Sequence, residues 1–219
     1  MIRLCSQKNS WVFEKIKYGL DVLVTSLALF FLCPVLFVIG SIIKMNSPGP
    51  ALYPGRAVGR GGREFTMYKF RSMKIDNTNS SHKGYVTKLI KDELDEEDKK
   101  NGVFKISDDS RVTSVGRFLR KFSLDELPQL INVLKGDMSL VGPRPCLPYE
   151  YELYKDWHKK RLSIQPGITC LWQVAGRSAV SFEDMVILDL YYIYNRNLMM
   201  DLNILYETVF VVLGKKGAY

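Results

Sequence analysis

Residues 22–43 read VLVTSLALFFLCPVLFVIGSII and contain no charged side chain. A straight helix of this length can cross the hydrocarbon layer of a membrane, which is about 30 Å thick. A cleaved signal peptide fits poorly, because the apolar run is too long and no small-residue cleavage site follows before Lys44. We therefore expect the protein to keep this segment as a membrane element.

Pro34 lies in the middle of the run, where proline removes a backbone hydrogen bond and bends or breaks a helix. Both flanks are basic: Lys8, Lys15 and Lys17 precede the run, and it is followed by Lys44, Arg56, Arg60, Arg63, Lys69 and Arg71. A spanning helix has one strongly basic end, so two such ends favour a re-entrant hairpin bent at Pro34 with both ends in the cytosol. A kinked spanning helix is an equal alternative, because membrane helices tolerate proline.

The length and charge of the chain limit its class and its partners. Its 219 residues suit one domain with an appendage and can bury a core. The formal net charge of +8 indicates an anionic partner, such as nucleic acid, an acidic membrane surface or a phosphorylated substrate. The four cysteines form no C-x-x-C pair and only two histidines accompany them, so a zinc site is not expected. We interpret the cysteines as reduced thiols.

The segment after the apolar run, residues 46–75, reads NSPGPALYPGRAVGRGGREFTMYKFRSMKI. Pro48, Gly49 and Pro50 are expected to end the membrane element. The GRGG sequence at residues 59–62 separates two short strand-like runs and predicts a β-hairpin. No Gly-Lys-Ser/Thr follows, so this glycine-rich turn is not a phosphate loop.

Two adjacent carboxylates, Asp125 and Glu126, lie in the sequence SLDELPQL at residues 123–130. Ser123 and Glu126 match the S-x-x-E capping box, so a helix start explains them without any chemistry. Apolar residues recur at helical spacing over residues 124–134, which predicts a helix ending at Gly136. Successive helical residues diverge by about 100°, so the two carboxylates suit two separate tasks.

Residues 181–219 are expected to form two helices with apolar and tyrosine-rich faces. These faces could belong to the core. They could also rest on the bilayer interface, with Arg196, Lys215 and Lys216 near the head groups.

Six motifs follow one another along the chain: KYGLDVLVTSLALFFLCP (17–34), SPGPALYPGRAVGRGGREFTMYKFRSM (47–73), RVTSVGRFLRKFSLDELPQLINVLKGDMSLVGPRP (111–145), PGIT (166–169), WQVAGR (172–177) and LDLYYIYN (188–195). Together they closely resemble the bacterial sugar transferase family of monotopic phosphoglycosyl transferases. The resemblance implies an α+β, mainly helical fold. It would comprise a re-entrant membrane helix hairpin in residues 1–46 and a small cytosolic catalytic domain in residues 47–219, with a short β-hairpin and interfacial helices.

The resemblance also implies an activity. Members transfer a sugar 1-phosphate from a UDP-sugar to undecaprenyl phosphate and release UMP, as the first membrane step of glycoconjugate or exopolysaccharide synthesis. Asp125 aligns with the family's nucleophile, which forms a phosphosugar-aspartyl intermediate, and Glu126 with the residue that helps to hold Mg²⁺. The expected location is the cytosolic face of the bacterial inner membrane, in contact with membrane lipid.

A carboxylate that attacks a diphosphate needs cationic donors around the phosphate oxygens. The candidate substrate-binding residues are Lys69, Arg71, Arg120, Arg144 and Arg177. Taken singly, each is equally well explained as a surface charge or a structural ion pair. Cys170 stands where the family commonly has glycine after PGIT, and its effect is left open.

Two other functions compete with this prediction. An inactive membrane scaffold would not need the carboxylates, the arginines and the GPRP sequence together. A nucleic-acid-binding module fits less well, because the sequence shows no aromatic stacking sheet and no recognition helix. The identity of the sugar is left open, since a family resemblance does not transmit it, and a homo-oligomer is possible.

Overall fold

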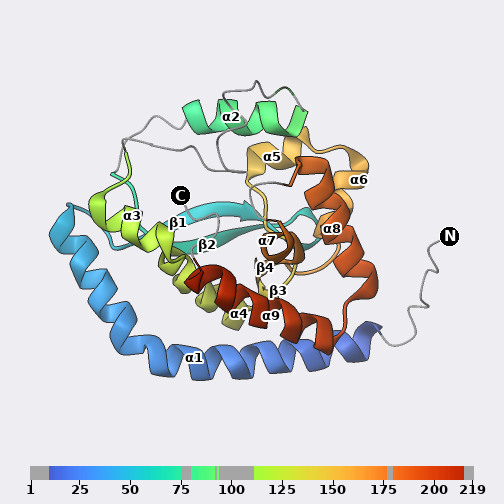
Figure 1. Cartoon of the computed structure of the whole chain (residues 1–219), viewed down its shortest axis with the longest axis horizontal. Coiled ribbons are helices and arrows are strands. Elements are labelled where there is room, and N and C mark those ends of the chain that lie inside the picture. The colour runs from blue at the N-terminus through green and yellow to red at the C-terminus, as the bar shows by residue number, and fades with distance from the viewer. Residues whose placement is uncertain (1–9, 75–79, 92, 94–110, 177–179, 215–219) are drawn as a thin grey trace.

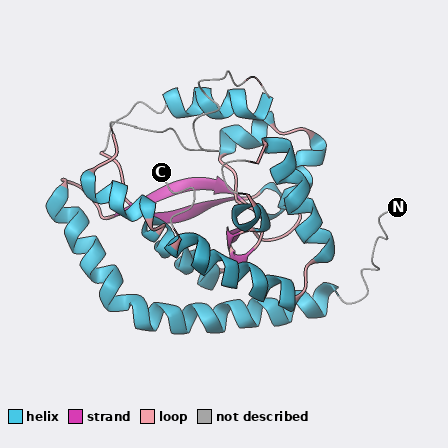
Figure 2. Ribbon diagram, viewed as in Figure 1, coloured by secondary structure: helices cyan, strands magenta, loops and turns pink. Residues whose placement is uncertain are grey.

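The computed structural model describes residues 10–74, 80–91, 93, 111–176 and 180–214. Helices dominate these parts of the chain and enclose two small sheets (Figure 1 and Figure 2). The mainly helical α+β class is thereby confirmed. The helices are α1 (Ser10–Asn46), α2 (Ser80–Lys91), α3 (Ser114–Lys121), α4 (Leu130–Lys135), α5 (Pro148–Leu153), α6 (Asp156–Lys159), α7 (Leu171–Ala175), α8 (Phe182–Asn195) and α9 (Leu198–Leu213). The strands are β1 (Leu52–Val58), β2 (Glu64–Phe70), β3 (Ser139–Val141) and β4 (Gly167–Thr169).

α1 is one helix of 37 residues with Pro34 inside it. Figure 1 shows that α1 bends into two arms but does not fold back on itself. Proline removes one backbone hydrogen bond and crowds the preceding turn, which accounts for a bend without a break. The segment expected to form a helical hairpin is thus a single bent helix. The placement of its two ends relative to a membrane stays a prediction.

Among the described helices, α1 alone is long and apolar enough to cross a membrane, by length and composition. Only 11% of its apolar window is buried, which distinguishes it from the core helix of a soluble domain. Large apolar side chains are exposed along its whole length, from Trp11 to Met45. α9 adds further exposed apolar residues, namely Leu202, Tyr206, Val209 and Phe210. A continuous apolar surface of this kind marks a membrane or protein contact.

The predicted β-hairpin is confirmed. β1 and β2 pair antiparallel, with Tyr53 opposite Lys69 and Val58 opposite Glu64. Gly61 and Gly62 in the connecting 3-10 turn η1 (Arg60–Gly62) have φ angles of 67° and 78°, which glycine adopts without strain. The GRGG sequence therefore forms the turn, as expected from its glycines.

The two helices expected over residues 181–219 are confirmed as α8 and α9. α8 directs Phe182, Met185 and Val186 into one apolar core cluster, and Ile204 of α9 lies in a second. The outer faces of both helices carry exposed apolar residues, including Tyr194 and Phe210. Core and exposed surface therefore occur on opposite faces of the same helices.

Candidate active site

Ser123 lies between α3 and the 3-10 turn η3 (Leu124–Gln129), and its backbone is left-handed, with φ 54° and ψ 21°. Its side chain makes no capping hydrogen bond. Its backbone N–H instead donates to the carbonyl oxygen of Arg120 at 3.2 Å, in the last turn of α3. An N-cap residue needs an extended backbone, whereas a residue after a helix end is commonly left-handed. The predicted capping box is wrong, because Ser123 closes the preceding helix.

The helix expected over residues 124–134 forms in two pieces, η3 and α4, and ends at Gly136 with φ 77°. The end at Gly136 is as predicted. Asp125 and Glu126 lie in the 3-10 piece, where successive residues diverge by about 120°. Both are half-buried. The two carboxylates therefore point in different directions from one short turn.

Lys69 on β2 and Glu126 on η3 form an ion pair, with 3.1 Å between Lys69 Nζ and Glu126 Oε1. The two side chains remain 28% and 27% exposed, so a ligand can reach them. Pairs this open to solvent contribute little to stability. An accessible ammonium group paired with the Glu126 carboxylate, one residue after Asp125, suits a site that handles phosphate charge.

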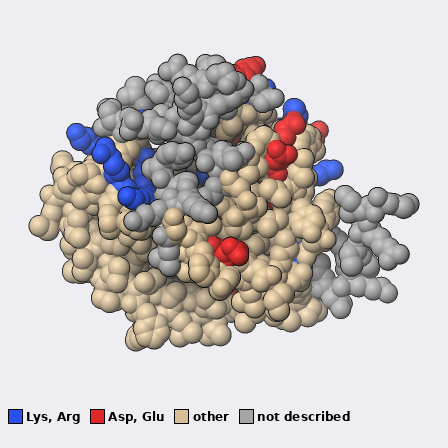
Figure 3. Space-filling view, in the orientation of Figure 1, with Lys and Arg blue, Asp and Glu red and all other residues tan. Residues whose placement is uncertain are grey.

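α3 packs against the chain just after β2. A Cβ atom on Gly116 would lie 1.9 Å from the carbonyl oxygen of Ser72, so this close approach requires glycine. One turn later, Arg120 Nε donates to Ser72 Oγ at 2.9 Å. This contact brings Arg120 to the same end of the hairpin as Lys69. Figure 3 shows basic side chains gathered over α3.

Asn132 is a positioning residue that the sequence analysis missed. It is fully buried, its Oδ1 accepts from the N–H of Tyr68 at 3.0 Å, and its Nδ2 donates to the carbonyl oxygen of Thr66 at 2.7 Å. These bonds tie α4 to β2 next to Lys69 and so fix the strand beside η3. The available sequence signal was a single polar side chain within the apolar run LINVL at residues 130–134.

Arg71 differs from its expected role as a phosphate ligand. Its guanidinium group is buried and donates to the carbonyl oxygens of Ser47 at 2.7 Å and Pro48 at 2.5 Å, and more distantly to that of Ile43 at 3.5 Å. Arginine at a helix C-terminus commonly satisfies the last carbonyl groups in this way. Arg71 thus holds the end of α1 against the hairpin, and the proposed substrate site does not include it.

Arg144 lies away from the Lys69–Glu126 pair. Arg144 lies two residues before Cys146, and Cys146 forms a β-bridge with Val58. Val58 is at one end of β1, whereas Tyr53, which pairs with Lys69, is near the other end. Arg144 lies near Asp189, a buried residue that forms an ion pair with Arg161. Burial raises the pKa of Asp189, and the charges of Arg161 and Arg144 oppose this rise.

Two other sequence expectations concern residues 170–177. Arg177 lies outside the described residues, so its role at the site stays a prediction. Cys170 is buried, with an extended backbone at φ −147° that any residue adopts. Its N–H donates to Gln173 Oε1 at 3.1 Å at the start of α7. The backbone at this position does not require the glycine that is common in the family.

The described residues contain no group of three histidine, cysteine or acidic side chains that could hold a metal ion by themselves. Mg²⁺, however, usually binds through one or two carboxylates together with waters and substrate phosphate oxygens. Asp125 and Glu126 provide carboxylates of that kind at an accessible turn. The donor set therefore fits a magnesium ion that arrives with a diphosphate.

Comparison with known proteins places the chain among sugar transferases. Residues 12–215 match the profile of the bacterial sugar transferase family. The chain is 42% identical over 204 residues to the undecaprenyl-phosphate galactose phosphotransferase of Salmonella typhimurium, covering 93% of this chain and 42% of that protein. It is 46% identical over 171 residues to the galactosyl transferase CpsE of Streptococcus agalactiae, covering 78% of this chain and 36% of CpsE.

A relative of similar length is the exopolysaccharide production protein ExoY of Sinorhizobium fredii, at 38% identity over 203 residues and covering 93% of this chain and 88% of ExoY. The chain spans less than half the length of the Salmonella and Streptococcus proteins. The match extends from the start of α1 to the end of α9. The chain belongs to the bacterial sugar transferase family.

Proposed function

We propose that this protein transfers a sugar 1-phosphate from a UDP-sugar to undecaprenyl phosphate at a membrane surface, as an early step of exopolysaccharide or glycoconjugate synthesis. The names of relatives support this substrate pair, since they include an undecaprenyl-phosphate galactose phosphotransferase and a UDP-galactose-lipid carrier transferase. The observation that carries the proposal is the ion pair of Lys69 with Glu126 at an accessible turn, where Asp125 is the neighbouring residue of η3 and Arg120 lies at the same end of the hairpin.

The first proposed step is attack by a carboxylate oxygen of Asp125 on the phosphorus atom that carries the sugar. An O–P bond to Asp125 forms, the bond from that phosphorus to the bridging oxygen breaks, and UMP leaves with the bonding electron pair. In the second step a phosphate oxygen of undecaprenyl phosphate attacks the same phosphorus, and the Asp125 carboxylate is released. Covalent catalysis of this kind divides one difficult displacement into two.

The first step brings an anion toward an anion, so cations must neutralise the phosphoryl oxygens. Lys69 and Arg120 are the described cations best placed to do so. Arginine can grip two phosphate oxygens in a fork, and lysine acts as a mobile point charge. A magnesium ion held by Glu126, with substrate oxygens completing its ligands, would supply further charge neutralisation. The Lys69–Glu126 contact keeps both side chains oriented toward this region.

We further propose that both ends of α1 lie on the cytosolic side of the bacterial inner membrane. The basic flanks, the bend and the exposed apolar surface of α1 and α9 support a bent helix whose middle lies in the bilayer while both ends stay at one membrane face. This placement would hold the site beside the lipid that carries the acceptor phosphate.

The proposed activity is tested with purified protein, undecaprenyl phosphate and a panel of UDP-sugars, with UMP release as the readout. At least one UDP-hexose or UDP-N-acetylhexosamine should release UMP only when Mg²⁺ is added. A chain that is folded and inserted in membrane but releases no UMP with any sugar would contradict the proposal and favour a scaffold role.

A further inference from the structure

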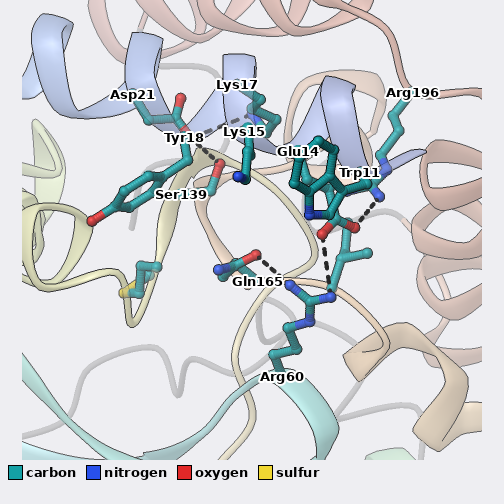
Figure 4. Close-up of a pocket in the computed structure, with 12 residues that line it drawn as sticks. Trp11, Glu14, Lys15, Lys17, Tyr18, Asp21, Arg60, Ser139, Gln165 and Arg196 are labelled. Atoms are coloured by element: carbon teal, nitrogen blue, oxygen red, sulfur yellow. Dashed lines mark hydrogen bonds and ion pairs between the residues drawn. The ribbon is translucent and has the colours of Figure 1, made fainter. Parts of the chain in front are cut away.

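A cavity of about 250 Å³ lies between the first turns of α1, the turn of the β1–β2 hairpin and the link between α8 and α9 (Figure 4). Its lining side chains are mostly polar or aromatic. They are Trp11, Glu14, Lys15, Lys17, Tyr18, Asp21, Arg60, Met138, Ser139, Ile164, Gln165 and Arg196. Four of these residues are basic and two are acidic, so the lining carries an excess of positive charge.

Two guanidinium groups in this cavity already hold an anion. Glu14 accepts from Arg196 at 2.8 Å through Oε1 and from Arg60 at 3.3 Å through Oε2 (Figure 4). Arg60 is also oriented by Gln165 Oε1 at 3.3 Å. Burial acts to raise the pKa of Glu14, but its bonds and charge interactions with Arg196 and Arg60 outweigh this and lower the pKa. The site is therefore built to favour a negatively charged group.

Lys15 adds a third cation at the rim. Its ammonium group lies 3.8 Å from the centre of the Trp11 ring, and the Trp11 side chain is 65% exposed. Lys17, by contrast, is held by Asp201 at 2.7 Å. Lys15 and Arg60 are exposed, and Glu14 is the acid that pairs with Arg60 and Arg196. The three cations Lys15, Arg60 and Arg196 therefore exceed the charge of Glu14, which leaves charge for a second anion.

The cavity is separate from the proposed catalytic turn. Arg60 lies in the turn of the hairpin, next to the paired residues Val58 and Glu64. Lys69 lies five positions after Glu64 along β2. Strand residues advance by about 3.3 Å each, so the two ends are on the order of 15 Å apart. A ligand in the cavity would not occupy the site at Glu126.

The rim of the cavity continues into apolar surface. Val12 is exposed beside Trp11 on α1, and Leu198 and Met199 are exposed just after Arg196 at the start of α9. Tryptophan and basic residues together are typical of the membrane–water interface. An amphiphile could place a phosphate in the cavity and its acyl chains along these apolar residues.

We propose that this cavity binds the phosphate head group of an anionic phospholipid, as a lipid site distinct from the catalytic turn. The phosphate would take donors from Lys15, Arg60 and Arg196, while the acyl chains lie on the exposed faces of α1 and α9. The bound lipid would fix the first turns of α1 against the hairpin turn. This inference rests on the proposed membrane placement of α1.

The test uses the whole protein in nanodiscs of phosphatidylcholine containing a small fraction of phosphatidylglycerol, with retained lipid measured by native mass spectrometry. The variant carries Lys15→Gln and Arg60→Gln together. Its matched control carries Lys159→Gln and Lys160→Gln, because these remove the same charge and Lys159 likewise lies over a ring, that of Tyr151 at 5.2 Å. Each basic residue near a membrane surface contributes about 1 kcal/mol to binding of anionic lipid, so two correspond to roughly tenfold or more.

We expect the wild type and the control to retain phosphatidylglycerol, and the Lys15/Arg60 variant to lose about tenfold in its preference for that lipid. Equal losses in both variants would show only diffuse attraction and would overturn the site. Preferential retention of undecaprenyl phosphate over phosphatidylglycerol would overturn the assignment to a phospholipid. Binding of inorganic phosphate in phosphatidylcholine discs, without retention of phosphatidylglycerol in the mixed discs, would overturn it as well. Insertion into pure phosphatidylcholine discs is scored separately, so a failure of the membrane placement is distinguishable from a failure of this inference.

Discussion

Lys17 and Asp201 are 184 positions apart in the sequence, yet Lys17 Nζ lies 2.7 Å from Asp201 Oδ2. Both side chains are only 9% exposed. Asp201 also accepts from Tyr192 Oη at 2.6 Å, and Lys17 lies 3.6 Å from Asp21. This buried polar network joins the first arm of α1 to α8 and α9. It therefore holds the membrane helix and the C-terminal helices as one unit.

Replacing Asp201 should destabilise this unit. In Asp201→Asn, the amide oxygen can still accept a hydrogen bond from Lys17, but the negative charge opposite the buried ammonium group is lost, which costs about 3 kcal/mol in the free energy of unfolding. Chemical unfolding in detergent micelles measures this loss of unfolding free energy. Glu207→Gln, an exposed change on the same helix, serves as control and should stay within about 0.5 kcal/mol of wild type. An equally small loss for Asp201→Asn would mean that the network does not secure α1.

Ser123 and Ser181 allow the missing cap to be tested within one chain. Ser181 Oγ accepts from the N–H of Asp184 at 3.1 Å and caps α8, whereas the side chain of Ser123 caps nothing. Ser181→Ala should therefore cost about 0.5–2 kcal/mol and Ser123→Ala less than about 0.5 kcal/mol. Ser123→Gly should be neutral or stabilising by up to about 1 kcal/mol, because glycine adopts a left-handed backbone without strain. Equal costs for the two alanine variants would restore the capping box.

The stability of the protein should fall below neutral pH through His158. The side chain is buried, its Nδ1 accepts from the N–H of Lys155 at 3.2 Å, and burial together with the charge of Lys155 lowers its pKa below the usual 6.5. The unfolded chain takes up a proton near pH 6.5 while the folded chain does not, so the free energy of unfolding falls as pH drops from there toward the lowered pKa.

This pH dependence is measured by unfolding at about pH 8 and about pH 5.5. In His158→Gln the amide oxygen can still accept the bond from Lys155, and the part of the pH dependence that comes from this side chain should disappear. A loss of stability that is unchanged in His158→Gln would assign it to another group.

Topology is tested with single cysteines at Ser10 and Lys74 in a background with Cys5 and Cys33 replaced by alanine. Burial raises the pKa of Cys146 to about 12 and that of Cys170 well above its usual value, so both stay protonated and react poorly. Both introduced thiols should react only with reagent added to the cytosolic side. Labelling of one of them from the periplasmic side would indicate a spanning helix.

Local sequence signals predicted the parts of the fold that depend on neighbouring residues. The glycines of residues 59–62 predicted the hairpin turn. Gly136 predicted the end of α4, and Pro34 predicted the bend in α1. The same local reasoning failed at Ser123, because its backbone is set by the end of α3 and not by the turn that follows.

Contacts between distant segments could not be predicted from one sequence. Arg71 bonds to carbonyl groups 23 to 28 positions away, and Asn132 to a strand more than 60 positions away. The sequence indicated a phosphate ligand at Arg71 and no role at Asn132, and only the packing of α1, α4 and β2 shows the contacts that the two residues make. The resemblance to a family supplied Asp125 and Glu126, and the structure adds Lys69 as the partner of Glu126.

The most direct test of the central claim is the mass of the peptide that contains Asp125 after incubation with Mg²⁺ and the preferred UDP-sugar in the absence of undecaprenyl phosphate. The proposed mechanism predicts that this peptide gains the mass of one phosphosugar and that the adduct disappears when acceptor is added. The Asp125→Asn variant keeps the shape of the side chain but cannot attack phosphorus, so it should form no adduct and release no UMP. An adduct on another residue, or normal UMP release by Asp125→Asn, would contradict the account.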